Sequence, residues 1–353
     1  MAELGPNAEP NGGPGRDLRV GVIGTGIMGA DHVRTIATSV AGARVSAVTD
    51  LDTERARAAI DGIDGARVLS DPLGLVADDE VDAVLVASAD STHEELVLAC
   101  VEAGKPVLCE KPLTPTPDGS LRIVEAEEKA GRRLVSVGFM RRYDPGYVDV
   151  KETLREGVVG APLLLHCVHR NASSRPDAPS SGLITGSAVH EFDVIRWLLG
   201  EELTQITVFR PRSSSMVAGD TTDPLLVLVG TESGLLADVE VFVNAQYGYD
   251  VRCELVGELG SLSLDEPVRV RRRAERARAS TVSLDWRDRF AEAYRRELQD
   301  WVTGAATGEQ RGADAWDGYV ATVAAAAGVA ALGRPGSPVP VDLSPRPELY
   351  ARS

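Results

Sequence analysis

The feature that most constrains the fold is a glycine-rich turn between a strand pattern and a helix pattern, in the stretch RVGVIGTGIMGADHV. A β-branched run is followed at once by Gly24, Gly26 and Gly29, and helix-forming residues come next. Glycines in that context permit a tight turn, let the backbone approach a pyrophosphate and leave helix N–H groups facing the phosphates. The stretch therefore predicts a dinucleotide site. A glycine turn in an α/β domain that binds no nucleotide is the alternative.

The next β-branched run, ARVSAVTD, ends in Asp50, 21 residues after Gly29. At this spacing a carboxylate accepts hydrogen bonds from the adenosine ribose hydroxyls and repels the additional phosphate of NADP. The sequence therefore predicts NAD as the cofactor.

Between residues 18 and 137, short β-branched runs alternate with helical patterns. The runs are LRVGVI, ARVSAVTD, DAVLVAS, PVLCE and LVSVG. This alternation predicts a Rossmann domain, a doubly wound parallel sheet of the α/β class. Ser91 and Glu94 have the spacing of a capping box at the start of one helix, and two helices are expected to end at Gly104 and Gly131.

After about residue 138 strand-like runs follow one another with few helices between them, from PLLLHCVHR to GSLSL. This pattern predicts an α+β domain with a large, mainly antiparallel open sheet, one face of which meets helices and the other a partner. Two helices are expected at about 287–304 and 312–332. The 353 residues thus divide into a disordered tail (1–17), an NAD-binding domain (18–137) and a domain for substrate binding and oligomerisation (138–353).

Charge and composition exclude several kinds of partner. The chain has 37 basic and 53 acidic residues, a net charge of −16, which repels nucleic-acid backbones and anionic membranes. The apolar segment 319–333 is short and rich in alanine, so we expect a packed helix and no membrane span. The arginine-rich stretch 269–278 is interpreted as a solvated strand edge or loop, with an anion or subunit contact as the alternative.

Four cysteines are scattered along the chain without C-x-x-C spacing: Cys100, Cys109, Cys167 and Cys253. We expect buried free thiols in a reducing cytoplasm, and no metal site. The first 17 residues contain neither the basic nor the apolar region of a secretory signal.

A second candidate site follows the run VLC, where Glu110, Lys111 and Pro112 stand at the carboxyl end of a predicted strand. Open α/β sheets hold their ligands at that edge. A lysine beside a nicotinamide would stabilise a substrate oxygen as negative charge develops, whereas a surface charge is the plainer interpretation. The residues expected to contact the cofactor are Gly24, Gly26, Ile27, Met28, Gly29, Asp50, Glu110 and Lys111.

Over about residues 18–350 the chain resembles the Gfo/Idh/MocA oxidoreductases, and among them the inositol dehydrogenases. The stretches that carry the resemblance include EKP, VGFMRRYD, HCVHRN, VHEFDVIRWL and YGYDVRCELVGELG. The resemblance implies a cytoplasmic homotetramer that uses NAD to oxidise a secondary hydroxyl of a polyol, with myo-inositol or a close derivative as substrate.

The resemblance also implies roles for individual residues. Lys111 and His190 would be the catalytic pair, and His190 would take the hydroxyl proton, because an imidazole titrates near neutral pH. Substrate contacts would come from Met140, Arg141, His169, Asn171, Ser187, Asp193 and Tyr249. The structural alternatives include an ion pair between Arg141 and Asp193, and a half-buried strand aromatic at Tyr249.

At one position the sequence departs from the inositol dehydrogenases, which have an aspartate four residues before the histidine where this chain has Gly186. Three explanations remain. Asp193 or Asp177 approaches the imidazole instead, or the space admits a bulkier cyclitol with a hydrogen bond from Ser187, or the protein binds ligands and turns over slowly. A sugar or aminocyclitol dehydrogenase of a biosynthetic pathway and a non-catalytic homologue that binds NAD and a ligand are therefore the alternatives to cyclitol oxidation.

Overall fold

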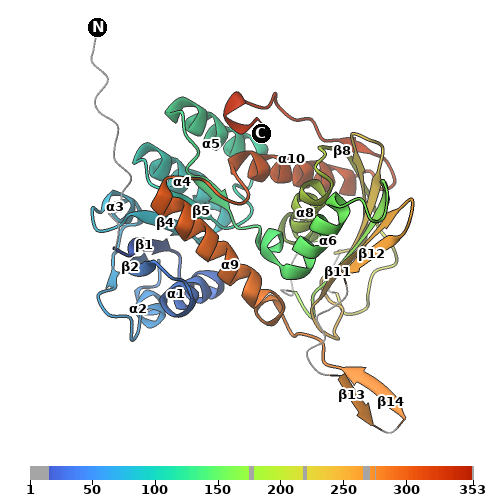
Figure 1. Cartoon of the computed structure of the whole chain (residues 1–353), viewed down its shortest axis with the longest axis horizontal. Helices are drawn as coiled ribbons and strands as arrows, with labels where there is room; N and C mark the ends of the chain where they lie inside the picture. Colours follow the sequence, from blue (N-terminus) through green and yellow to red (C-terminus); the bar gives the residue numbers. More distant parts are fainter. Residues whose placement is uncertain (1–15, 175–178, 218–220, 265–270, 275, 352–353) are drawn as a thin grey trace. The chain divides into compact units, whose positions relative to one another are not determined.

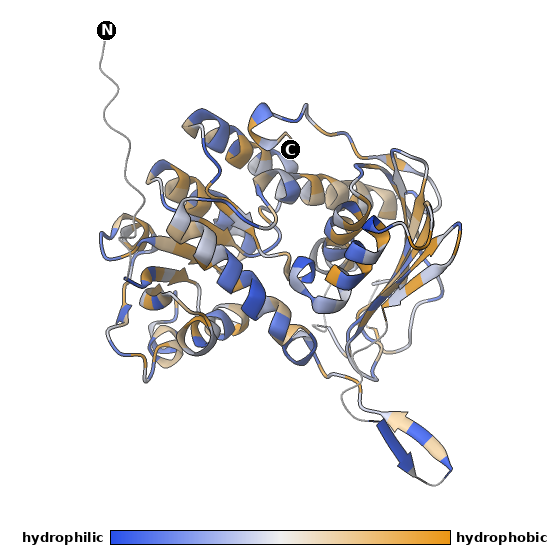
Figure 2. Cartoon of the chain, in the orientation of Figure 1, coloured by the Kyte–Doolittle hydropathy of each residue, from blue (hydrophilic) through white to orange (hydrophobic). Residues whose placement is uncertain are grey.

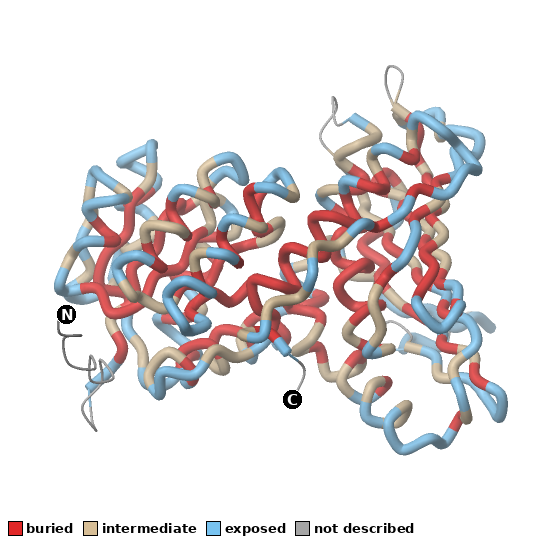
Figure 3. Tube along the Cα trace, turned by 90° about the horizontal axis from the view of Figure 1, so that it is seen from above, coloured by how far each residue is buried: buried red, intermediate tan, exposed pale blue. Residues whose placement is uncertain are grey.

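The computed structural model describes residues 16–174, 179–217, 221–264, 271–274 and 276–351. The predicted disordered tail, residues 1–17, lies almost entirely outside the described residues. Figure 3 shows that buried residues follow the strands and the inner sides of the helices.

The chain forms two compact units. The first contains the residues up to Gly138 together with Arg295–Trp316 and Pro347–Ser353. The second contains Phe139–Tyr294 and Asp317–Arg346. The units therefore differ from a division into consecutive segments at residue 138, because parts of the last 60 residues pack with the N-terminal sheet.

A six-stranded parallel sheet is the core of the first unit (Figure 1). Its strands are β1 (Leu18–Ile23), β2 (Ala43–Thr49), β3 (Arg67–Val68), β4 (Ala83–Val86), β5 (Val107–Cys109) and β6 (Val135–Val137). The order β3-β2-β1-β4-β5-β6 confirms the predicted doubly wound sheet. The order reverses between β1 and β4, and ligands of such sheets bind in the crevice at that point.

Helices cover this sheet, whose ribbon is largely coloured as hydrophobic (Figure 2). Apolar strand residues such as Val22 and Leu85 are wholly buried. The helices are α1 (Ile27–Ser39), α2 (Thr53–Ala59), α3 (Pro72–Ala77), α4 (His93–Glu102) and α5 (Pro117–Ala130), with the short turns η1 (Asp90–Thr92) and η4 (Glu348–Tyr350). Ile36 of α1 joins one hydrophobic cluster with Leu298 and Trp301 of the long helix α9 (Trp286–Thr307).

The predicted capping box at Ser91 is wrong. Helix α4 begins at His93, after the η1 turn, and its cap residue Thr92 accepts no capping hydrogen bond. Glu94 instead pairs with Arg122 of α5, 2.6 Å away. The predicted helix end at Gly131 is confirmed, because this residue caps α5 in the left-handed conformation (φ 68°).

The second unit is built on a seven-stranded sheet in the order β12-β11-β7-β10-β9-β8-β15. The strands are β7 (Pro162–Arg170), β8 (Leu203–Phe209), β9 (Leu225–Thr231), β10 (Leu236–Phe242), β11 (Asp250–Gly257), β12 (Ser261–Leu264) and β15 (Val339–Pro340). All neighbouring pairs are antiparallel except β7 and β10, which confirms the predicted mainly antiparallel sheet.

One face of this sheet is buried and the other is exposed. Leu165, Val239 and Leu255 on the inner face are 0% exposed, on the side where α6, α8 and α10 lie (Figure 1). The helical elements of the unit are η2 (Met140–Tyr143), α6 (Pro145–Arg155), α7 (Ser180–Gly182), the π-helix η3 (Leu183–Ala188) and α8 (Val189–Leu199), with most of α10 (Ala315–Leu332). Leu164 and Leu236 on the outer face are 41% and 43% exposed.

Three further features predicted from the sequence are an alanine-rich packed helix, buried free cysteines and a solvated arginine-rich stretch. Helix α10 has a mean hydropathy of 1.3 and is long enough to cross a membrane, but 67% of it is buried inside the protein, as in a core helix. All four cysteines are buried and free. In the described part of the arginine-rich stretch, β13 (Arg271–Ala274) pairs with β14 (Ala277–Ser280), and the described side chains of these two strands are exposed (Figure 1).

Candidate active site

The three glycines of the turn after β1 have three different structural roles. Gly24 has φ of +88°, and a Cβ there would lie 2.6 Å from backbone atoms of Ala87 and Ser88. A Cβ on Gly29 would collide with the carbonyl of Gly24, so glycine allows α1 to pack close to the strand. A Cβ on Gly26 would meet nothing within 4 Å. This open approach is the one that a pyrophosphate needs.

Asp50 lies at the end of β2 with its side chain 5% exposed. Its Oδ2 accepts hydrogen bonds from the backbone N of Thr25 (2.7 Å) and from the Thr25 hydroxyl (3.0 Å). Burial raises the pKa of Asp50, but the hydrogen bonds from Arg55, Asp52 and Thr25 outweigh it, so the net pKa is well below the usual range. The carboxyl is therefore ionised and can only accept hydrogen bonds.

A pocket of about 590 Å³ opens beside these residues at the carboxyl ends of β1, β2 and β4. Its lining includes Gly24, Gly26, Asp50 and Arg55. Leu51, also in the lining, is fully exposed, and Ile27 at the start of α1 is 72% exposed. Apolar side chains left open beside a glycine turn and an ionised carboxylate suit the adenosine half of a dinucleotide.

Glu110 and Lys111 follow β5 in the same unit. Glu110 is 7% exposed, and its Oε2 accepts a hydrogen bond from the backbone N of Lys111 (3.2 Å). Its Oε1 lies 2.8 Å from Nε2 of His32 in α1. His32 was not predicted from the sequence, although a histidine in the first turns of the helix that follows the glycines was a visible signal.

The second unit contains the predicted base. His190 lies in the first turn of α8 and is 7% exposed. Its ring centroid is 6.3 Å from that of Phe139 and 6.2 Å from that of His169 on β7. Tyr249, which precedes β11, lies 6.1 Å from His169 and is 5% exposed. The structure thus brings His190, His169 and Tyr249 into one cluster.

A buried ion pair contacts this cluster through His169. Arg141 in η2 and Glu191 in α8 are each 1% exposed and form a direct ion pair. Glu191 is also 3.0 Å from Nδ1 of His169. Burial raises the pKa of Glu191, but the nearby charges of Arg141 and His169 lower it to about 2. The ionised carboxylate can only accept hydrogen bonds. Nδ1 of His169 lies between it and Nη2 of Arg141, which is also 3.0 Å away.

Glu191 is the residue of this site that sequence reasoning missed. It follows His190 directly, in a helix whose residues from Val189 to Arg196 are all buried. A carboxylate within such an apolar pattern requires a buried partner, and this requirement was the available signal.

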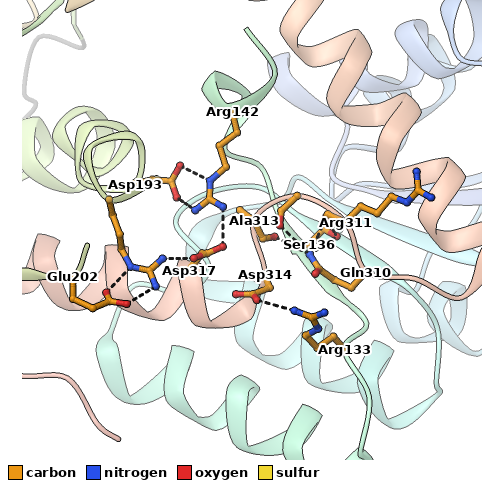
Figure 4. A network of polar contacts seen from close by, with 12 residues as sticks. Arg133, Ser136, Arg142, Asp193, Glu202, Gln310, Arg311, Ala313, Asp314 and Asp317 are labelled. Atoms are coloured by element: carbon orange, nitrogen blue, oxygen red, sulfur yellow. Dashed lines mark hydrogen bonds and ion pairs between the residues drawn. The ribbon is translucent and has the colours of Figure 1, made fainter. Parts of the chain in front are cut away.

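Asp193 belongs to a separate ion-pair network (Figure 4). Its carboxylate accepts hydrogen bonds from Nη2 (2.5 Å) and Nε (3.0 Å) of Arg142. Arg142 also donates to Asp317 (2.9 Å), which pairs with Arg196. The considered pair of Arg141 and Asp193 therefore does not form. The two adjacent arginines take different carboxylates, Glu191 and Asp193.

The other predicted substrate contacts are described by their burial. Met140 is 1% exposed and Ser187 is 7% exposed. The Oδ1 of Asn171 is buried and has no hydrogen-bond partner in the described part of the chain. A buried acceptor in this state is costly unless a ligand group or water donates to it, which makes Asn171 a suitable contact for a polyol hydroxyl.

Gly186, the position of the missing aspartate, lies within the π-helix η3. A Cβ built there would meet no atom within 4 Å. Because the residue lies in a helical segment and the space beside it is open, a side chain fits there. Asp177, one of the carboxylates considered as a substitute, lies outside the described residues.

Lys111 belongs to the first unit and His190 to the second. Each is described within its own unit, and their pairing at one substrate carbon stays a prediction.

These features define a class of protein. A doubly wound sheet with this glycine turn and carboxylate, followed in the chain by an open sheet that carries a buried imidazole cluster, is the architecture of a two-domain, dinucleotide-dependent oxidoreductase. Residues 18–139 match the family model described as oxidoreductase family, NAD-binding Rossmann fold, and residues 147–263 match the GFO/IDH/MocA C-terminal domain. The chain belongs to the Gfo/Idh/MocA oxidoreductase family, and its first unit contains an NAD-binding Rossmann domain.

Curated relatives and solved structures agree with this assignment. The chain is 55% identical to inositol 2-dehydrogenase 2 of Saccharopolyspora erythraea over 334 residues, which cover 95% of this chain and 98% of that protein. It is 48% identical to inositol 2-dehydrogenase of Paracoccus denitrificans, covering 95% and 99%. The crystal structure of myo-inositol dehydrogenase from Lactobacillus casei in complex with NAD(H) and myo-inositol superposes with a TM-score of 0.91 at 37% identity, covering 95% and 100%.

Proposed function

We propose that this protein is a cyclitol dehydrogenase that oxidises a secondary hydroxyl of myo-inositol, or of a close derivative, to the ketone (an inosose). The observation that carries the proposal is the likeness over 95% of the chain to a dehydrogenase whose structure holds NAD(H) and myo-inositol. Several relatives at 48–55% identity are named inositol 2-dehydrogenases.

NAD⁺, when bound, supplies the acceptor for the hydride that leaves the carbinol carbon. In the proposed mechanism, Lys111 holds the reacting hydroxyl and stabilises its oxygen as negative charge develops. His190 takes the hydroxyl proton as the carbon–oxygen bond becomes a carbonyl. The alcohol thereby loses one hydride and one proton, which balances the reaction.

The polyol is proposed to contact His169, Asn171 and Tyr249, with Met140 and Ser187 nearby. The buried Oδ1 of Asn171 suits a donating hydroxyl group of the polyol. Arg141 and Asp193 each form a buried ion pair. We therefore assign them a structural role, in which they hold neighbouring residues in place and do not contact the polyol.

The open space at Gly186 favours a second candidate substrate. An amino group or an additional substituent on the ring would fit where the inositol dehydrogenases have a carboxylate. An aminocyclitol or a sugar is therefore the alternative substrate class.

We also propose a cytoplasmic homotetramer assembled through the outer face of the seven-stranded sheet. This face presents exposed apolar side chains at Leu164, Leu236 and Phe209, which are 39–43% exposed. Apolar residues on an otherwise charged sheet face are typical of a subunit interface.

The test is to incubate the purified protein with NAD⁺ and a panel of inositol isomers, amino-inositols and hexoses while following NADH absorbance. Oxidation of myo-inositol with the highest kcat/KM of the panel supports the proposal. A higher value for an amino-inositol supports the alternative substrate. Binding of NAD without turnover of any polyol favours a non-catalytic homologue and overturns the proposal.

A further inference from the structure

Two buried histidines that the proposed mechanism does not use contact the segment carrying Lys111. His32 in α1 and His93 at the start of α4 are both 0% exposed. They come from different helices and reach opposite ends of the segment Glu110–Pro112. A buried polar side chain must satisfy its hydrogen bonds. Because both histidines do so through residues of this segment, they restrict the positions that the segment can take.

His32 contacts Glu110 through its side chain. Burial raises the pKa of Glu110, but the hydrogen bond from His32 and the charges of His32 and Lys111 outweigh it and lower the pKa below its usual value. The carboxyl is therefore ionised and only accepts, so Nε2 of His32 donates to Oε1 over 2.8 Å. The other oxygen accepts from the backbone N of Lys111.

Gly138 leaves the room that this arrangement needs. A Cβ there would stand 3.2–3.3 Å from the carboxylate atoms of Glu110, closer than most side chains tolerate. The carboxylate is thus enclosed by His32, the Lys111 amide and the chain after β6.

His93 holds the other end through the backbone. Its Nδ1 lies 2.9 Å from the carbonyl oxygen of Pro112, which can only accept, so the shorter contact of the ring is a hydrogen bond donated by Nδ1. Its Nε2 lies 3.3 Å from the carbonyl oxygen of Ser88. Glu110 and Pro112 flank Lys111 in the sequence, so both sides of the lysine are fixed by imidazoles from the two helices.

We propose that His32 and His93 are positioning residues for Lys111, an inference that rests on the proposed role of Lys111 at the reacting hydroxyl. They act through their hydrogen bonds to Glu110 and Pro112, and these bonds determine the position of the Lys111 backbone. Because His32 lies in the helix that begins at the glycine turn, it also ties the cofactor-binding helix to the lysine. A misplacement of about 1 Å costs about 100-fold in rate at a site of this kind.

The kinetic test replaces each imidazole in two ways. His32→Leu and His93→Leu remove the donors and are expected to lower kcat by about 100-fold, with the KM for NAD within about twofold. His32→Gln and His93→Asn place an amide N–H near Nε2 and Nδ1 respectively, and are expected to recover kcat to within about 10-fold of wild type. The matched control is Glu127→Gln, a buried polar change in the same unit, expected to leave kcat unchanged.

A second readout is independent of activity. The chain has four lysines, Lys105, Lys111, Lys129 and Lys151. Reductive ¹³C-methylation therefore gives few side-chain signals, and Lys111→Arg identifies the one from Lys111. We expect His32→Leu and His93→Leu to move the Lys111 signal and to leave those of Lys129 and Lys151 in place. Glu110→Asp, which retracts the carboxylate, supplies the same test if a leucine variant does not fold.

The outcomes separate the two proposals. A wild-type protein that oxidises no polyol overturns the proposed function, whereas the Lys111 signal still tests the positioning by His32 and His93. An unmoved Lys111 signal overturns the positioning role. The role is also overturned if the leucine variants keep their kcat, or if the amide variants fail to recover it while remaining as stable as wild type.

Discussion

The carboxylate of Asp50 lies 2.5 Å from the guanidinium of Arg55 at the edge of the dinucleotide pocket. The arginine side chain is 51% exposed while the aspartate side chain is 5% exposed, so the carboxylate is the fixed partner of the pair and the arginine lies in solvent. Two opposite preferences for the cofactor are thus present at one place. The carboxylate repels the additional phosphate of NADP, and the arginine would attract it once released.

Asp50→Ala is therefore expected to lower the ratio of kcat/KM with NAD to kcat/KM with NADP by at least about 10-fold, since it removes the repulsion and frees Arg55. Steady-state kinetics with both cofactors measures this ratio. In Asp50→Ala/Arg55→Gln the gain with NADP should be smaller than in the single variant, because the arginine that attracts the additional phosphate is also removed. An unchanged ratio in the single variant would remove Asp50 from cofactor selection.

Gly186→Asp tests whether the absent carboxylate limits turnover. The space around the glycine is open, so the variant should fold with a free energy of unfolding within about 1 kcal/mol of wild type. If the remaining pocket suits myo-inositol, kcat should rise by about 10-fold or more, because a carboxylate that orients an imidazole and stabilises its cation contributes strongly to catalysis.

Gly186→Asn is the matched control, with nearly the same shape and no charge. A rise in kcat with asparagine as large as with aspartate would attribute the effect to shape. No rise in either variant would mean that the glycine was not the limiting feature, and would favour a substrate that needs the space.

The sequence was sufficient for most of the fold and for the cofactor site, because both depend on local patterns. Strands buried on both faces appear as continuous apolar runs, and β7 has the bounds of the predicted run PLLLHCVHR. The pairings of buried charges were not predictable. Arg141 and Arg142 are neighbours in one short turn, yet they point to different carboxylates, and nothing local distinguishes them.

The contact of His32 with Glu110 illustrates the same limit. The two residues are 78 positions apart, on a helix and at the end of a strand. Only the sheet order, which places β5 two strands from β1, brings the helix after β1 close to the segment after β5. Sequence patterns describe each element, whereas contacts between distant elements follow from how the sheet is wound.

Glu191→Gln is expected to destabilise the protein by about 3 to 5 kcal/mol, since it leaves the guanidinium of Arg141 buried without its counter-charge. Urea unfolding at pH 7 measures the change. The double variant Arg141→Met/Glu191→Leu should lose less than the sum of its single variants, because it leaves no charge unpaired.

The matched control for this pair is exposed. Asp238 and His166 form a carboxylate–imidazole pair on the outer sheet face, with side chains 34% and 45% exposed. Asp238→Asn should change the free energy of unfolding by less than about 1 kcal/mol. Equal losses in Glu191→Gln and Asp238→Asn would contradict the structural role of the buried pair.

Glu127 in α5 gives the first unit a pH-dependent stability. It is 0% exposed and accepts hydrogen bonds from the backbone N of Val135 (2.7 Å) and from the hydroxyl of Tyr350 near the chain end. Burial raises its pKa to about 7, against the opposing effect of these hydrogen bonds. Between the ordinary carboxyl pKa and pH 7, the Glu127 carboxyl is therefore protonated in the folded protein and ionised in the unfolded chain.

Stability from Glu127 is consequently greatest at acidic pH and is lost as the pH rises through about 7, by about 3 kcal/mol in total. Glu127→Gln, which is neutral at every pH, should remove this part of the slope when urea unfolding is measured at pH 5, 6, 7 and 8. Glu128→Gln, at the exposed neighbouring position, should keep the wild-type slope. If Glu127→Gln follows the wild-type curve at every pH, the carboxyl is already ionised in the folded protein, and the hydrogen bonds from Tyr350 and the backbone outweigh its burial.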